Sequence, residues 1–386
     1  MDVPIGGACA PGFDGVRDAF VANFVERGEL GGAVCVRLHG EVVVDLWGGW
    51  ADEARTRPWG PDTLVDVYSV GKAIVATLLL QSIDDGEVAL DTPVAEVWPE
   101  FALGGKHAVT VAQALSHQGT VPAIREPLSD EALQDWDRMA SALAATPAWW
   151  PVGTRHAYHV NTYGHLVGEV IRRLTGSSPG ERLREAVGPL DADVFFGVPD
   201  EMLDRCADIV WAPGHGIVAP PPDLDGLDDE TLMRVLAHYN PPGYSSIGVV
   251  NTTAWRQTEV PSTNGHATAR GIARFYGALI DEDEPLLSPD LLADASRPWS
   301  VGPCPMLGQD VAFGLGFTPT TPNRPLGPGP RAFGHFGSGG ALGYADPDLG
   351  VGFGYVMNHV IPRWQSTRNR ALVDALAEVI EDVPPQ

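Results

Sequence analysis

The stretch of residues 69–85 constrains the fold most, because its helical pattern is apolar on nearly every side. It reads SVGKAIVATLLLQSIDD, and Gly86 follows it as a natural stop. A surface helix keeps a polar stripe toward water, whereas a helix that is apolar all round is buried. We therefore expect this helix at the centre of the molecule, enclosed by the rest of a chain of 386 residues.

The remaining hydrophobic pattern predicts helices in the middle of the chain and strands near both ends. Apolar runs on either side of residues 38–41 predict a β-hairpin with a tight turn. Residues 212–228 are rich in proline and glycine and are expected to form a loop. Helical spacing is found at 15–30, 130–145, 162–175, 268–279 and 366–380, and short strand patterns at 332–336, 341–345 and 351–357.

This order of elements predicts an α+β fold. We expect the terminal segments, residues 1–85 and 290–386, to share one antiparallel sheet flanked by helices. Residues 86–289 would then form an inserted, mainly helical domain. A ligand site is expected in the cleft between the two parts.

Composition argues against several classes of protein. A net charge of −25 repels phosphate backbones, so nucleic acid is not an expected partner. No apolar run reaches about 18 residues, so we expect no association with a membrane. The first residues lack the basic and apolar regions of a secretory signal, and the four cysteines lack disulfide or C-x-x-C spacing. These features predict a cytoplasmic protein with reduced cysteines.

Lysine is almost absent, since only Lys72 and Lys106 occur among 25 basic residues. Lys72 follows Ser69 by one helical turn, so the two side chains share one face of the apolar helix. A serine hydroxyl is a weak nucleophile that needs an adjacent base, and a buried lysine can supply one because burial disfavours its charged form. Arginine cannot, because its guanidinium stays protonated. The pair predicts acyl transfer with Ser69 as the nucleophile.

Four segments carry a resemblance to a known superfamily. Residues 69–72, SVGK, resemble the Ser-x-x-Lys motif of the serine β-lactamases and penicillin-binding proteins. Residues 114–119 (ALSHQG), 150–159 (WPVGTRHAYH) and 334–340 (GHFGSGG, followed by Asp346-Pro347) resemble later segments of the class C branch, especially the family VIII carboxylesterases. The resemblance covers nearly the whole chain, in motif order.

The resemblance implies a β-lactamase/transpeptidase-like fold and a role for each matching residue. Ser69 would be the nucleophile, Lys72 its proton-accepting neighbour, and Tyr158 the general base or acid that serves the leaving group. The backbone N–H groups of Ser69 and Ser338 would form the oxyanion hole. Tyr163, inside the following helix, is the rival position to Tyr158. The sequence leaves open whether Lys72 or Tyr158 takes the first proton.

Two departures from the superfamily pattern bear on the substrate. β-Lactamases carry Tyr-x-Asn, but Val160 stands at the asparagine position and Asn161 is one step off. They also carry Lys-Thr-Gly where this chain has His335, Phe336 and Gly337. A mostly neutral histidine beside a phenylalanine recognises a carboxylate poorly, so we expect these three residues to bind neutral esters. His335 is expected either to donate a hydrogen bond near the leaving group or to have a structural role.

Other chemistries lack their motifs. The one G-x-S-x-G match, GSSPG at residues 176–180, follows the helical pattern of 162–175 and not the strand that a nucleophile elbow needs, and the chain has no nucleotide-binding glycine motif. His156, His159 and His165 have no acidic or thiol partner at metal-ligand spacing, so neither a metal nor another cofactor is expected. The combined prediction is a serine carboxylesterase that cleaves short-chain acyl esters through an acyl-enzyme. A β-lactamase or D-alanyl peptidase, an amide hydrolase, an acyltransferase and a non-catalytic ligand-binding relative remain as alternatives.

Overall fold

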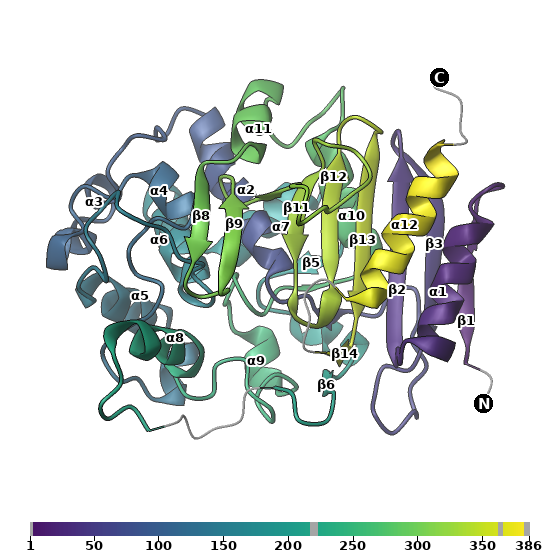
Figure 1. Ribbon diagram of the computed structural model, residues 1–386, viewed down its shortest axis with the longest axis horizontal. Helices are drawn as coiled ribbons and strands as arrows, with labels where there is room; N and C mark the ends of the chain where they lie inside the picture. Colours follow the sequence, from purple (N-terminus) through teal and green to yellow (C-terminus); the bar gives the residue numbers. More distant parts are fainter. Residues whose placement is uncertain (1–2, 217–222, 362–365, 382–386) are drawn as a thin grey trace.

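The computed structural model describes residues 3–216, 223–361 and 366–381 and has a layered arrangement of sheet and helices (Figure 1). Within the loop expected at 212–228, the described residues form neither helix nor strand. Residues 217–222 of that loop lie outside the described residues. The predicted α+β class is confirmed.

A seven-stranded antiparallel sheet, ordered β1-β3-β2-β13-β12-β11-β10, joins the two ends of the chain. At the join, β2 pairs with β13, and Val34 lies opposite Tyr355. Strands from the two ends of the chain therefore share one sheet. Its strands are β1 (Ile5–Cys9), β2 (Gly31–Leu38), β3 (Glu41–Gly49), β10 (Thr318–Pro319), β11 (Phe333–Phe336), β12 (Leu342–Asp346) and β13 (Val351–Met357).

The predicted hairpin is β2–β3. Its turn residues, His39 and Gly40, have positive φ angles of 48° and 82°, which is the backbone of the two-residue turn that matches the twist of paired strands. The edge strand β1, which pairs with β3, was not predicted. Two glycines among its five residues, IGGAC, leave little strand signal in the sequence.

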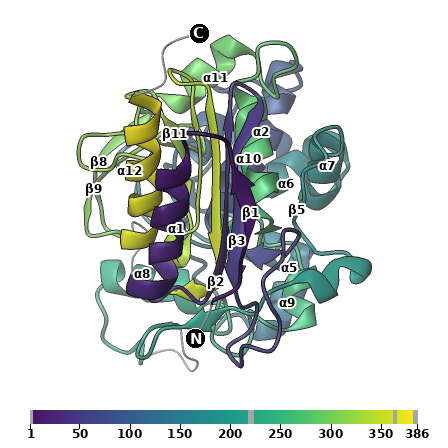
Figure 2. The same cartoon turned by 90° about the vertical axis from the view of Figure 1, so that its right-hand side faces the viewer.

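Helices cover both faces of the sheet. Figure 2 shows α1 (Asp14–Glu26) and α12 (Thr367–Glu381) on one face and α10 (Ala269–Leu279) on the other. Helix α10 contacts β2, β12 and β13. It approaches so closely that a Cβ on Gly354 would lie 2.4 Å from Ala269 O. This helix therefore packs on the sheet, although it lies within residues 86–289, the range expected to form the inserted helical part.

The middle of the chain is mainly helical. The helix expected at 130–145 is interrupted at Asp135, whose carboxylate caps the second half by accepting a hydrogen bond from Arg138 N at 3.0 Å. In the described residues, no helix has the length and hydrophobicity needed to cross a membrane. The helices and 3₁₀ turns are α3 (Val94–Val97), η1 (Pro99–Gly105), α4 (Val111–Leu115), η2 (Asp130–Gln134), α5 (Trp136–Ala145), α6 (Thr162–Thr175), α7 (Pro179–Val187), η3 (Asp200–Arg205), α8 (Asp229–Tyr239), α9 (Thr253–Gln257), α11 (Pro289–Ser296) and η4 (Ser338–Gly340).

Short strands outside the main sheet were not predicted. β4 (Val65–Asp66), β7 (His266–Ala267) and β5 (Val194–Phe195) form a small antiparallel sheet, and β4 lies just before the helix that begins at residue 70. β8 (Ser300–Cys304) and β9 (Gln309–Phe313) form a hairpin, and β6 (Val210–Trp211) pairs in parallel with β14 (His359–Val360).

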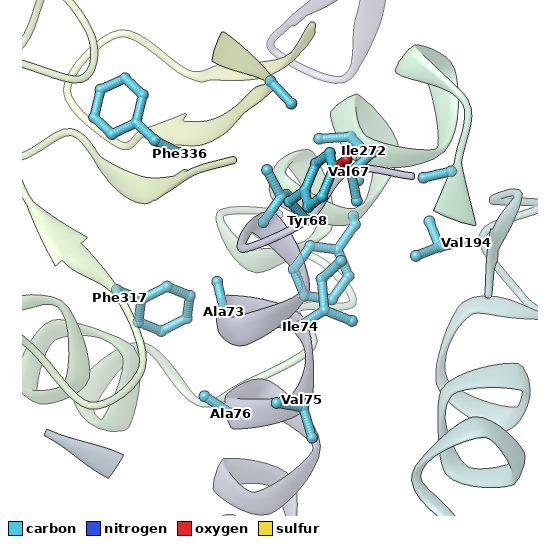
Figure 3. Close-up of a cluster of buried hydrophobic side chains, with 14 of the residues drawn as sticks. Val67, Tyr68, Ala73, Ile74, Val75, Ala76, Val194, Ile272, Phe317 and Phe336 are labelled. Carbon is cyan, nitrogen blue, oxygen red and sulfur yellow. The ribbon is translucent and has the colours of Figure 1, made fainter. Parts of the chain in front are cut away.

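Helix α2 (Val70–Asp84) occupies the centre, in contact with α6, α7 and β11. Every residue from Val70 to Leu80 is buried. Figure 3 shows apolar side chains on several sides of it, with Phe317 and Val194 on opposite sides. A Cβ on Gly71 would lie 2.2 Å from Pro261 O, so the neighbouring loop can approach only because this position is glycine. The predicted central, buried helix is confirmed.

Candidate active site

Ser69 stands at the N-terminus of α2 and is half-buried. Lys72, one turn later, is fully buried. Its Nζ lies 2.9 Å from Ser69 Oγ. The two residues singled out by their spacing are thus in direct contact.

Two backbone carbonyls fix the amine of Lys72. Nζ donates to Val160 O at 2.7 Å and to Ser262 O at 2.8 Å. Burial without a compensating negative charge lowers the pKa of Lys72 well below its usual value of 10.5. Carbonyl oxygens only accept hydrogen bonds. A neutral amine would therefore give both of its hydrogens to the carbonyls and direct its lone pair at the hydroxyl of Ser69.

The second lysine, Lys106, has a different set of partners. Its Nζ donates to three carbonyls, Leu103 O at 2.6 Å, Ala144 O at 2.9 Å and Thr146 O at 2.5 Å. Three carbonyls require three N–H groups, which only an ammonium has. Burial lowers the pKa of Lys106 to about 8, which still leaves it charged at pH 7. Lys106 therefore ties η1 to the C-terminus of α5, where a positive charge is favourable.

Tyr158 lies just before α6, and its side chain is close enough to that of Ser69 for the serine to act on its pKa. Lys72 Nζ lies 4.8 Å from the centroid of its ring. Burial raises the pKa of Tyr158 above its usual value of 10. The rival Tyr163 instead donates its hydroxyl hydrogen to Leu115 O at 2.9 Å, within the core. Of the two tyrosines, it is Tyr158 that reaches Ser69.

Aromatic rings hold Tyr158 from several directions. Its ring stacks on Phe313 with the centroids 5.7 Å apart, and on His335 with the centroids 6.1 Å apart. A third ring, that of His117, lies 4.9 Å away in a tilted arrangement. The orientation of Tyr158 is therefore set by packing as well as by its hydroxyl.

The strand end that carries the third motif touches the segment leading to Ser69. A Cβ on Gly337 would lie 2.3 Å from Val67 O. Ser338, the next residue, is exposed in the turn η4. Among the described residues, neither the N–H of Ser69 nor that of Ser338 donates a hydrogen bond within the protein. Two uncommitted N–H groups on touching segments are the ingredients of an oxyanion hole.

His335 is buried at the end of β11, beside Tyr158. Its Nδ1 lies 2.7 Å from Phe336 O, which can only accept, so Nδ1 carries the proton. Burial and the nearby charge of Lys72 lower the pKa of His335 to about 3. At neutral pH Nε2 is therefore a hydrogen-bond acceptor. In this tautomer Nε2 has no hydrogen to donate, so the expected hydrogen bond from His335 to a leaving group cannot come from this atom.

The ring of Phe336 is part of the main hydrophobic core, and Figure 3 draws it with the other buried apolar side chains. Any contact of this residue with a substrate would be through its backbone. Gly337, also buried, has no side chain to offer. Of the three residues expected to bind substrate, His335 is the one whose side chain packs on Tyr158.

The loop that supplies the second carbonyl to Lys72 was not predicted. Ser262 Oγ donates to Asn161 O at 2.6 Å, and Thr263 Oγ1 donates to Asn161 Oδ1 at 3.0 Å. Asn161 therefore secures this loop. Every residue has a carbonyl, so the residue types do not reveal this acceptor. The close approach of the loop to α6 does require a glycine at position 164, because a Cβ on Gly164 would lie 2.6 Å from Ser262 N.

The turn before Ser69 is held in an unusual backbone conformation. Tyr68 has a positive φ of 50°. Its N–H donates to Asp66 Oδ1 at 2.8 Å, and Trp255 Nε1 donates to Asp66 Oδ2 at 3.1 Å. Burial raises the pKa of Asp66 to about 7. A carboxyl group thus shapes the bend that presents Ser69.

The histidines weighed as metal ligands have other contacts. His159 Nδ1 donates to Ala157 O at 2.7 Å, and His165 packs on Trp136 with ring centroids 4.9 Å apart. Within the described ranges, no group of three or more His, Cys, Asp or Glu is placed to hold a metal ion.

Comparison with known proteins places the chain in a family. The sequence pattern of the family described as Beta-lactamase matches residues 17–378, nearly the whole chain. The chain belongs to the β-lactamase family. The resemblance seen in the four sequence segments is thereby confirmed.

Individual relatives of the β-lactamase family agree with this assignment. The chain is 34% identical over 371 residues to "Esterase/beta-lactamase LipL" of Mycobacterium tuberculosis, covering 92% of this chain and 83% of that protein. A crystal structure of a family VIII carboxylesterase is 36% identical, with a TM-score of 0.88 over 97% of this chain and 100% of that one. A penicillin-binding protein homologue from Caulobacter crescentus is 38% identical, with the same TM-score and coverage. The protein is a serine hydrolase with the β-lactamase/transpeptidase-like fold.

Proposed function

We propose that this serine hydrolase is a carboxylesterase that cleaves small, neutral esters with short acyl chains through an acyl-enzyme on Ser69. One observation carries the proposal: Lys72 Nζ lies 2.9 Å from Ser69 Oγ, at the start of a buried helix. Tyr158, whose side chain lies beside the same serine, completes the set. A nucleophile with two proton-carrying neighbours can both form and break an acyl ester.

In this proposal Lys72 is the first base. Its lowered pKa makes the neutral amine more accessible than in a solvent-exposed lysine, and the carbonyls of Val160 and Ser262 leave the lone pair for Ser69. Tyr158, with its raised pKa, stays a phenol and can donate a proton. The opposite directions of the two pKa shifts divide the roles of base and acid.

The reaction then follows in two halves. Ser69 Oγ bonds to the ester carbonyl carbon, its proton passes to Lys72, and the carbonyl electron pair forms an oxyanion that accepts from the N–H groups of Ser69 and Ser338. The bond to the alcohol breaks, and the leaving oxygen takes the proton of Tyr158, which is replaced by the proton held on Lys72. Water repeats the sequence on the acyl-enzyme and releases the carboxylic acid.

The preference for neutral esters rests on what surrounds Tyr158. His335 is neutral near pH 7 and offers an acceptor, so it does not attract a carboxylate. Beside Tyr158, the partly buried apolar side chains are those of Val160, Met306 and Leu307. Val160 occupies the position of the asparagine found in β-lactamases. An apolar wall of this kind suits an alkyl acyl group.

A labelling and turnover experiment tests the proposal. The protein is treated with a fluorophosphonate, and the adduct is located by mass spectrometry, with Ser69→Ala as the control. The adduct is expected on Ser69, and p-nitrophenyl acetate and butyrate are expected to be hydrolysed with a burst. An adduct on another residue contradicts the mechanism, and absence of ester turnover in a protein labelled at Ser69 contradicts the substrate class.

β-Lactam hydrolysis is the second candidate, because one relative carries both activities in its name. In this chain the charge of Arg324 acts on both Tyr158 and His335, so a cation faces the same region. It could attract the carboxylate of a cephalosporin. The two candidate activities are separated by assaying a chromogenic cephalosporin beside the esters, in the wild type and in Arg324→Gln. A kcat/KM higher for the cephalosporin than for p-nitrophenyl butyrate would make β-lactam hydrolysis the first candidate.

A further inference from the structure

His117 lies in an unusual backbone conformation next to the proposed site. Its φ is +61°, in the left-handed region that residues with a Cβ rarely adopt. The residue is buried, with 2% of its surface exposed. A non-glycine residue persists in this conformation only where its surroundings hold it firmly. The contacts of His117 show what holds it.

Two hydrogen bonds connect His117 to the residues on either side of Tyr158. The N–H of Ala157 donates to His117 O at 3.1 Å. The N–H of His159 donates to His117 Nδ1, also at 3.1 Å. Because Nδ1 accepts, the imidazole is neutral, with its proton on Nε2. One residue therefore anchors the backbone immediately before and immediately after the tyrosine.

The ring of His117 also packs against the tyrosine itself. Its centroid lies 4.9 Å from that of Tyr158 and 4.4 Å from that of Phe313. On another side it lies 4.6 Å from Tyr163, whose hydroxyl is fixed to a core carbonyl. The imidazole thus lies between a fixed core ring and the ring of Tyr158.

We propose that His117 is a positioning residue that holds the hydroxyl of Tyr158 toward Ser69, by anchoring the backbone on both sides of Tyr158 and packing on its ring. The inference rests on the proposed role of Tyr158 in proton transfer. His117 itself is not hydrogen-bonded to Ser69 or Lys72 in the described structure. Its removal should therefore act on the rate of acyl transfer more than on substrate binding.

Two substitutions separate the acceptor from the ring. His117→Phe keeps a ring but removes the acceptor for His159 N–H, whereas His117→Asn removes the ring and keeps an oxygen near the position of Nδ1. Asparagine also tolerates a positive φ. We expect His117→Phe to lower kcat for p-nitrophenyl butyrate by about 10- to 100-fold, the scale of a small misplacement of a reacting group, with KM nearly unchanged. His117→Asn should recover most of kcat.

A matched control is His165→Phe, which removes another buried histidine whose Nδ1 has no partner among the described residues. It should leave kcat unchanged. If His117→Phe does not fold, as judged by thermal unfolding, His117→Gly replaces it, because glycine accepts the left-handed backbone without strain. The glycine variant is expected to lose kcat as the phenylalanine variant would.

Two results overturn the positioning role. One is wild-type kcat in His117→Phe or His117→Gly, and the other is an equal loss of kcat in His117→Asn and His117→Phe. Tyr158→Phe, measured in parallel, tests the proposed function separately. If Tyr158→Phe retains wild-type kcat, the role of Tyr158 fails first. If Tyr158→Phe is inactive while the His117 variants are fully active, only the positioning role fails.

Discussion

Replacing Lys72 with arginine or methionine gives the sharpest test of the active-site chemistry. The wild-type amine is fully buried, donates to two carbonyls and faces Ser69 Oγ at 2.9 Å. Lys72→Arg keeps a positive charge but removes a base, because a guanidinium does not deprotonate. Loss of a general base costs about 10²–10⁴-fold in rate, or about 3–5 kcal/mol in the barrier. We expect acylation to fall by at least this factor in both variants.

The stability of these variants separates chemistry from folding. Lys72→Met leaves the carbonyls of Val160 and Ser262 without their donor, at a cost of about 1–3 kcal/mol each. It also removes a buried amine, and the lowered pKa of Lys72 shows that burial works against its charged form. These contributions oppose one another, so we expect the free energy of unfolding to change by no more than about 2 kcal/mol.

The assay is the burst of p-nitrophenol on mixing with p-nitrophenyl acetate, together with urea unfolding of each variant. Lys106→Met is the matched control, since it removes the other buried lysine and should keep the burst. The wild-type burst rate should also rise with pH through the lowered pKa of Lys72 and level off well below pH 10.5. A folded Lys72→Arg enzyme with a wild-type burst would show that the lysine is structural and would refute the assignment of the base.

Further outcomes can be stated briefly. Tyr158→Phe should lower kcat for p-nitrophenyl butyrate by about 10²–10⁴-fold, the contribution of a general acid, in steady-state assays; loss of less than tenfold would remove the proton donor from the scheme. Lys106→Met should lower the free energy of unfolding by about 2–4 kcal/mol in urea, because three carbonyls lose their donor; an unchanged midpoint would contradict this. Stability should fall as the pH drops from 6.5 to 4, because the unfolded chain then takes up protons that the buried imidazoles do not. Four carboxyls with raised pKa values, those of Glu29, Asp66, Glu259 and Asp346, oppose this trend. The histidines concerned, whose pKa values are lowered to about 3 or 4, are His159, His165, His266 and His335. Urea titrations at several pH values measure how the free energy of unfolding changes with pH. A free energy of unfolding that rises on acidification would refute the prediction.

The sequence predicted the parts of the molecule that depend on residue type and spacing. The apolar pattern of residues 69–85 led to α2, and the spacing of Ser69 and Lys72 led to their contact, since one helical turn fixes the geometry of such a pair. The hairpin β2–β3 followed from two apolar runs and a short turn. Local geometry of this kind is determined within a few residues.

Features that depend on backbone groups far away along the chain could not be predicted from the sequence. The carbonyls of Val160 and Ser262, which define the state of Lys72, come from loops 88 and 190 residues away along the chain. Every residue has a carbonyl, so nothing in the residue types marks these two. The tautomer of His335 likewise depends on one carbonyl, that of Phe336, and on burial. Such contacts are set by tertiary packing.

The burial of both lysines has a consequence for handling the protein. Lys72 and Lys106 are the whole lysine content, and each is 0% exposed. The exposed cations of the described surface are therefore arginines, which do not react with amine-directed esters or aldehydes. Conventional crosslinking or coupling through lysine would find no exposed side-chain amine on the folded protein. Slow modification of Lys72 by such a reagent would instead measure how often the buried site opens.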